Sequence, residues 1–293
     1  MSNTLESSPT VLQESAGSPA PVHRTVIRPT SGLAVLNLKE VWDYRDLLLV
    51  LAMRDIKLRY RQTALGVVWV VLQPLLAAGI FTFVFGKVAK MPSDGVPYFI
   101  FSFAGQLGWN LFSGALTKSS TVLVGNQQLV TKIYFPRLVL PLSTIFSVLV
   151  DFGVALAMMV ILMIGYHVVP HVGLLLFPLW LILFLMLGIG IGLITSSISV
   201  KYRDINYVVP IFVQFLMYAS PVAYAVSVVP AKWHAIYMVN PLSGLLEAFR
   251  WSFFGKGHLD WVGLGYSAVV AVAVFVWGAF AFRKMERTMA DVI

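Results

Sequence analysis

Few side chains in this sequence have both the type and the spacing that catalysis or metal binding requires. Asp94, Asp204 and Asp260 stand singly and far apart, and Asp151 is the one acidic residue well inside a long apolar stretch. The five histidines, at positions 23, 167, 171, 234 and 258, match no metal-ligand spacing, and cysteine is absent. These observations argue against a metal centre and against a transferase that acts on polyprenyl-linked sugars.

The isolated carboxylate of Asp151 is the one candidate for ion coupling. Ionisable groups inside apolar segments often mark ion pathways, but ion-coupled carriers usually need several of them. The sequence shows no evident basic partner for Asp151 within the apolar stretches. Two interpretations stay open: a functional role near an entrance, or a hydrogen bond to a neighbouring helix.

The sequence also lacks the motif that would let it bind ATP by itself. It contains no G-x-x-x-x-G-K-[ST] segment. Gly188, Gly190 and Gly192 follow no strand, so their spacing indicates close helix packing rather than a dinucleotide site. We therefore expect no cofactor in this chain, and any process that needs ATP would take its energy from a separate subunit.

Composition places the chain in a membrane. Of its 293 residues, 58% are hydrophobic and 12% charged, with a mean hydropathy of +0.82. Soluble domains average about 25% charged residues. The net charge of +8 comes from Lys and Arg residues that separate long apolar runs. This pattern sets topology and does not indicate nucleic-acid binding.

Six stretches are long enough to cross a bilayer, which takes about 20 apolar residues. The expected spans are about 63–86, 96–117, 138–165, 172–200, 205–225 and 261–282. With both termini in the cytoplasm, sixteen of the 21 Lys and Arg residues lie inside, as the positive-inside rule requires. We expect an all-α membrane fold with six transmembrane helices per protomer, within a domain of residues 63–283. The polar segment 1–31 is expected to be a disordered cytoplasmic tail, and 284–293 the cytoplasmic C-terminus.

The segment 32–62, before the first span, has the periodicity of an amphipathic helix. Arg54, Lys57 and Arg61 lie away from its apolar stripe, so the helix is expected in the cytoplasmic interface plane, near lipid headgroups. A solvated helix that only anchors topology is the alternative. The stripe consists of Leu38, Trp42, Leu49, Met53, Ile56 and Tyr60.

Two connecting segments are more than loops. In the cytoplasmic segment 119–136, residues 127–135 are expected to form a short helix that exposes apolar surface unless a partner covers it; a self-packed turn is the alternative. The outer segment 227–260 is rich in aromatic residues, and Pro230 and Asn240-Pro241 interrupt it. It predicts short re-entrant or interfacial helices that form either an outer gate or an anchor at the headgroup level.

Aromatic residues are abundant in the first and fifth expected spans. Most such side chains pack against lipid or neighbouring helices. Lining a wide channel, their faces would instead stack on sugar rings without binding any one position tightly, which suits a moving polymer.

Short motifs stand in a fixed order from about Leu38 to the C-terminus. They are Arg54–Tyr60, Gln62-Thr63, Leu65-Gly66, Trp69, Gln73-Pro74, Asn126, Leu129, Lys132, Phe135-Pro136-Arg137, Tyr202-Arg203-Asp204, Ser220-Pro221, Tyr224, Asn240-Pro241 and Phe249-Arg250. In this order the sequence resembles ABC-2 type permeases that export polysaccharides or polyol phosphates. The long polar N-terminal tail falls outside the resemblance.

The resemblance implies a homodimer in the cytoplasmic membrane of a bacterium, with two copies of an ATP-binding subunit that carries ATP and Mg. Its cargo would be a lipid-linked polysaccharide, O-antigen-like or capsular. It also implies roles for four groups of residues. Segment 122–135 and the residues at its end would couple to the ATPase subunit, through Asn126, Leu129, Lys132, Phe135, Pro136 and Arg137; the lipid-linked head group would contact Arg54, Lys57, Arg59 and Arg61. The channel would be lined by Trp69, Phe81, Phe85, Phe212, Phe215, Tyr218 and Tyr224. The outer gate would consist of Trp233, Asn240, Pro241, Phe249 and Arg250.

Two other transport functions stay open. An ABC-2 permease for a drug or small lipid would share the same fold, although the aromatic spans and the interface helix favour a polymer. An ion-coupled flippase would export without any ATPase and would depend on Asp151.

Overall fold

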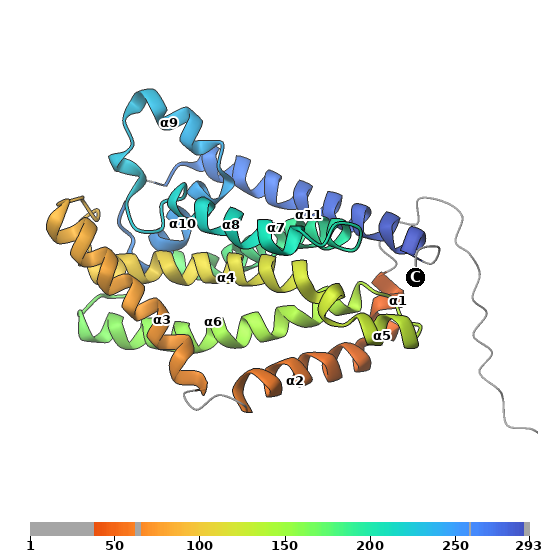
Figure 1. Ribbon diagram of the computed structural model, residues 1–293. Coiled ribbons are helices and arrows are strands. Elements are labelled where there is room, and N and C mark those ends of the chain that lie inside the picture. The colour runs from red at the N-terminus through yellow and green to blue at the C-terminus, as the bar shows by residue number, and fades with distance from the viewer. Residues whose placement is uncertain (1–37, 62–65, 258, 290–293) are drawn as a thin grey trace, which may run out of the picture. The chain divides into compact units, whose positions relative to one another are not determined.

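The computed structural model describes residues 38–61, 66–257 and 259–289. All regular elements in these ranges are helices, which confirms the all-α class (Figure 1). The expected tail 1–31, His23 and His258 lie outside the described residues. The elements are α1 Leu38–Asp43, α2 Arg45–Arg61, α3 Gly66–Phe81, the π-helix η1 Thr82–Val88, α4 Tyr98–Gly125, α5 Gln127–Lys132, α6 Val139–Gly165, η2 Val172–Leu176, α7 Phe177–Ser199, α8 Ile205–Tyr218, η3 Val226–Val228, α9 Ala231–Met238, α10 Pro241–Phe254 and α11 Trp261–Met289.

Four helical segments in the described part of the chain are long and apolar enough to cross a membrane. They are Val68–Val88 (α3 with η1), Val139–Gly165 (α6), Val172–Ser199 (η2 with α7) and Trp261–Glu286 (α11). Of the other two expected spans, α8 is a 14-residue apolar helix, and α4 has 28 residues with polar side chains along its length. The fifth span is therefore shorter than expected, because the chain turns after Tyr218.

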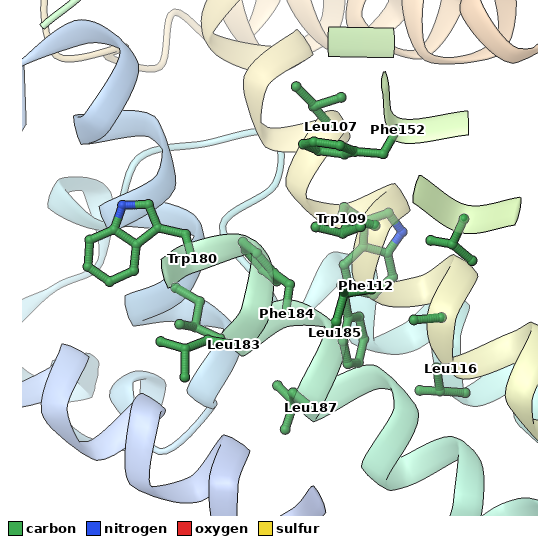
Figure 2. Packing of buried hydrophobic residues seen from close by; sticks show 14 of the residues in the cluster. Leu107, Trp109, Phe112, Leu116, Phe152, Trp180, Leu183, Phe184, Leu185 and Leu187 are labelled. Carbon is green, nitrogen blue, oxygen red and sulfur yellow. The ribbon is translucent and has the colours of Figure 1, made fainter. Parts of the chain in front are cut away.

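The core of the fold is built around α4 and α7. In Figure 1, α4 lies beside α6 and α7, and α7 lies beside α11; α2 packs on α6, and α3 packs on α4. Fully buried aromatic rings, among them Phe112 of α4 and Phe184 of α7, fill the space between these helices (Figure 2). Helix α10 packs against α11, α4 and α7.

Glycines allow α7 to approach two helices closely. A Cβ on Gly188 would lie 2.6 Å from the carbonyl oxygen of Phe112, and one on Gly192 would lie 3.0 Å from that of Leu116, both in α4. On the other side, a Cβ on Gly190 would lie 2.7 Å from the backbone nitrogen of Phe275 in α11. The expectation of close helix packing is confirmed, and the alternating spacing places α7 between α4 and α11.

Candidate transport and coupling site

Asp151 lies at the centre of a charged cluster formed by three helices. Its carboxylate accepts a 2.6 Å hydrogen bond from the Tyr60 hydroxyl of α2 and lies 3.2 Å from Arg59 Nη2 of the same helix. Lys118 Nζ of α4 lies 3.0 Å from the same carboxylate and donates to Ser147 Oγ at 2.9 Å. The partners of Asp151 come from outside the expected spans: Arg59 precedes the first span and Lys118 follows the second, so no sequence pattern indicated that either would reach it.

The charged cluster borders a cavity of about 250 Å³. Five helices contribute to it: α2, α3, α4, α6 and α8, so it connects the interface helix with both helices expected to line the channel. Its polar lining residues are Arg59, Gln73, Asn110, Ser113, Thr117, Lys118 and Asp151, and its apolar ones include Val70, Pro74, Val148 and Val213. The cavity can accommodate a polar group beside two cations.

The interface helix α2 has two apolar faces. Leu51 and Ala52 are buried where α2 packs on α6. Leu49 and Met53, which belong to the expected stripe, are about half exposed and lie on the other face. Tyr60 of the same stripe points inward to Asp151, which lies twelve residues into α6, about 18 Å along its axis. Sequence periodicity found the exposed face but missed the packed one.

The four basic residues of α2 that the resemblance assigns to the head group lie in different environments. Arg54 Nη2 lies 2.8 Å from both Asp55 Oδ1 and Asn126 Oδ1, so it ties α2 to the end of α4. Arg54 also lines, with Lys57 and Arg61, a mainly apolar surface hollow on the exposed face of α2, whereas Arg59 reaches the cavity at Asp151. Arg54 therefore also links α2 to the coupling segment.

The coupling segment forms the expected short helix, α5, which ends at Lys132. Phe135 is 4% exposed and Pro136 is buried, while the backbone N–H of Arg137 donates to Glu286 of α11 at 2.9 Å. The side chains presented outward are instead Gln127, Gln128, Thr131, Lys132, Ile133 and Tyr134, while Leu129 is half-buried. Phe135 and Pro136 therefore lie in the packed interior of the loop. Its exposed apolar surface comes from Ile133 and Tyr134, which lie in the expected coupling segment but were not named individually.

Four of the expected channel residues lie on exposed helix faces, while Phe81 and Phe85 are partly buried. Trp69 of α3 and the α8 residues Phe212, Phe215 and Tyr218 are 46–72% exposed, and Phe81 packs edge-on against Phe85 with ring centroids 5.8 Å apart. Tyr224 differs, because it lies in the turn after α8. Its hydroxyl donates to the Tyr218 carbonyl at 3.1 Å and accepts from the Tyr237 hydroxyl at 3.0 Å.

The expected gate residues split between surface and core. Trp233 is exposed on α9, and Asn240 caps α10, its side chain accepting from Leu242 N at 3.1 Å with Pro241 at the first helical position. Phe249 is fully buried among other aromatic rings, and Arg250 is 4% exposed. Both therefore belong to the packed interior, whereas Trp233 is the exposed member of the expected gate.

Arg250 is buried in α10 with specific partners. Its Nη1 donates to the Pro221 carbonyl at 2.6 Å, and its guanidinium lies 4.3 Å from the centre of the Phe101 ring. A buried cation is stable only with such partners. Arg250 thus fixes the turn after α8 to α10 and α4.

Comparison with known proteins agrees with this architecture. A family model described as ABC-2 type transporter matches residues 46–254. An O-antigen export system permease protein RfbA of Myxococcus xanthus is 29% identical over 252 residues, which are 85% of this chain and 96% of that protein. One from Klebsiella pneumoniae is 28% identical over 253 residues, 85% of this chain and 95% of that protein. The polysialic acid transport protein KpsM of Escherichia coli is 25% identical over 248 residues, 82% of this chain and 93% of that protein. The chain is thus a multi-pass membrane permease that belongs to the ABC-2 type transporter family.

Proposed function

We propose that this chain is the transmembrane subunit of an exporter that moves a lipid-linked polysaccharide, O-antigen-like or capsular, across the cytoplasmic membrane of a bacterium. The observation that carries the proposal is the similarity, over more than four-fifths of the chain, to permeases named for O-antigen and polysialic acid. In the proposed assembly, two copies of the chain form a homodimer, each crossing the membrane six times with both termini in the cytoplasm.

Energy is proposed to come from two copies of a separate ATP-binding subunit, which would hold ATP and Mg. The α5 loop would dock on that subunit through Lys132, Ile133 and Tyr134, which are exposed around a short helix. Motion of the loop would pass to α2 through the hydrogen bond between Arg54 and Asn126. The exposed faces of α3 and α8 would then change their separation and let the polymer advance.

The contacts of Asp151 disfavour an ion-coupled flippase. Its carboxylate already accepts a hydrogen bond from a hydroxyl and pairs with two cations, so its contacts are those of a structural anchor between α2, α4 and α6. The rival function is tested directly by expressing the chain in cells that lack the ATP-binding subunit. Export that persists there would refute the proposed function.

The docking surface is tested with Ile133→Asp in cells that carry the ATP-binding subunit. The new carboxylate would be desolvated in an apolar contact without a cationic partner. We therefore expect subunit binding to weaken at least about tenfold and the amount of surface polysaccharide to fall in parallel. The readouts are co-purification of the two subunits and immunoblots of surface polysaccharide. Val169→Asp is the control. It adds the same charge at a residue that is 81% exposed and lies beyond the C-terminal end of α6, whereas the α5 loop precedes the start of that helix. Normal binding by Ile133→Asp would exclude the α5 loop as the docking site.

A further inference from the structure

We propose that Glu247 of α10 is a pH-sensitive switch: when protonated it lets Arg250 hold the turn after α8, residues 219–225, and when charged it draws Arg250 away and loosens that turn. The inference rests on the proposed function only for the side of the membrane, which places α10 at the outer face. The proton would then come from the external medium.

Glu247 borders a small cavity between α10, the start of α4 and the segment that follows α10. The cavity measures about 10 Å³, close to the volume that one water molecule needs. Its charged lining residues are Asp94, Glu247, Arg250 and Lys256, and its apolar ones are Val96, Phe101 and Phe254. The cavity therefore offers at most one water to a carboxylate that can accept about four hydrogen bonds.

The Glu247 side chain has no partner for a negative charge. It is half-buried and makes no hydrogen bond or ion pair with the described residues. Both cations of the cavity are bonded to backbone carbonyls instead: Arg250 Nη1 donates to Pro221 and Lys256 Nζ to Gly95, each at 2.6 Å. Such a site favours the neutral form of a carboxyl group.

Electrostatics point the same way. Burial raises the pKa of Glu247 from its ordinary 4.5 to about 7; Arg250 acts against this rise. The negative charges of Asp94 and Asp260 add to it. The elements packed against α10 also bring Tyr98, His171, Tyr237, Lys256 and Tyr266 towards it, whereas α7 carries no titratable side chain. Glu247 therefore changes its charge near neutral pH.

Arg250 connects this charge to the turn after α8. It lies three residues after Glu247, so the two side chains are neighbours on the surface of α10. A charged Glu247 attracts the Arg250 guanidinium and competes for it with the Pro221 carbonyl. The hydrogen bond from the Tyr98 hydroxyl to the Ala223 carbonyl, at 2.7 Å, then remains to hold the turn against α4. The turn is loosened without unfolding α10.

Proton linkage sets the direction and the size of the effect. The closed turn keeps Glu247 away from water and binds the proton more tightly than a loosened state does. The closed state is therefore favoured fully below pH 4.5, and this preference is lost as the pH rises through about 7. Each unit of pKa difference is a tenfold change in an equilibrium, so loosening should increase at least about tenfold between pH 5 and pH 8.

The test uses one introduced cysteine, because the chain contains none. Val222 lies in the turn and is 1% exposed, so the thiol of Val222→Cys reacts when the turn loosens. Purified full-length Val222→Cys in detergent is labelled with a maleimide from pH 5 to pH 8, with and without Glu247→Gln. The pH dependence of the thiol and of all other groups is common to both proteins, so the ratio of the two labelling rates isolates Glu247.

We expect this ratio, the rate with Glu247 over the rate with Gln, to rise at least about tenfold from pH 5 to pH 8. A ratio that does not change with pH, or that falls towards pH 8, would overturn the proposal.

Thermal unfolding gives a second measurement that needs no cysteine. Between pH 5 and pH 8 the wild-type midpoint should fall, relative to that of Glu247→Gln, by at least about 3 °C. Asp46→Asn is the control, since it removes a carboxylate whose side chain is 89% exposed, and it should keep the pH dependence of the wild type. Parallel pH dependence of wild type and Glu247→Gln would refute the switch.

Neither measurement involves the cargo or the ATP-binding subunit. A pH dependence that requires Glu247, in a chain that exports no polysaccharide, would refute the proposed function and leave the switch standing. Export by a chain whose labelling ratio is independent of pH would do the reverse.

Discussion

The contact between α7 and α11 gives the most direct test of the packing. Gly190 meets α11 with no side chain between the two backbones, and Gly278 of α11 faces Gly190. In Gly190→Ala, the new Cβ would lie 2.7 Å from the backbone nitrogen of Phe275 and 2.8 Å from its Cα. Real Cβ atoms essentially never come closer than 3.0 Å to a neighbour. Backbone atoms cannot rotate away, so the two helices must separate.

Two opposing effects set the size of the change. Alanine is a better helix former than glycine by about 1 kcal/mol, which stabilises any Gly→Ala variant in a helix. Overpacking a tight interior costs about 1–3 kcal/mol, and the larger values apply where backbone must move. Gly265→Ala, in α11, has the better helix propensity of alanine but no overpacking cost, because no atom lies within 4 Å of its new Cβ. The difference between the two variants therefore isolates the overpacking cost, about 2 kcal/mol.

The assay is the midpoint of thermal unfolding of each purified variant in the same detergent. At about 2–4 °C per kcal/mol for a chain of this size, Gly190→Ala should unfold about 4–8 °C below Gly265→Ala. Gly278→Ala should fall with Gly190→Ala, since the two glycines face each other. Equal midpoints for all three variants would show that α7 and α11 do not pack at these positions.

Three further results are expected. Arg54→Gln breaks the charged link to Asn126, a half-exposed contact of about 1 kcal/mol, so export should fall about fivefold while ATP hydrolysis by the complex persists; parallel loss of both activities would contradict a coupling role. Arg250→Met leaves the buried Pro221 carbonyl without its donor and should cost about 1–3 kcal/mol, seen as a lower thermal midpoint; an unchanged midpoint would exclude a structural role. Phe215→Ala, on an exposed face of α8, should change the free energy of unfolding by no more than about 0.5 kcal/mol but should reduce export; normal export would exclude α8 from the polymer path.

Several features follow from the sequence because they depend on neighbouring residues alone. Long apolar runs, broken only by Asp151 in α6, predict where α6, α7 and α11 lie, since backbone in lipid must form helices. Asn240-Pro241 predicts the start of α10, because Asn caps a helix and Pro fits its first turn. Three glycines at alternating positions predict close helix contacts. The order of short motifs also identifies the family correctly.

Local patterns do not reveal how deeply a side chain lies in the assembled bundle. The sequence places Phe135 in a cytoplasmic connecting segment and Phe249 and Arg250 in an outer interfacial segment, yet all three side chains are buried. Their burial results from α10 and the α5 loop packing against other helices, which periodicity within one segment does not encode. The segment 127–135 was expected to expose apolar surface, and Ile133 and Tyr134 are indeed exposed, although the sequence did not single out Tyr134.

The partners of Asp151 illustrate the limit most clearly. The sequence by itself determined that a lone carboxylate lies inside an apolar stretch and that basic residues gather before the first span. Only the tertiary structure decided that Tyr60, 91 positions away, and Lys118, 33 positions away, meet that carboxylate at one cavity. The physical reason is that burying a charge requires a partner in space, and only the packing of α2, α4 and α6 determines which partner comes within reach.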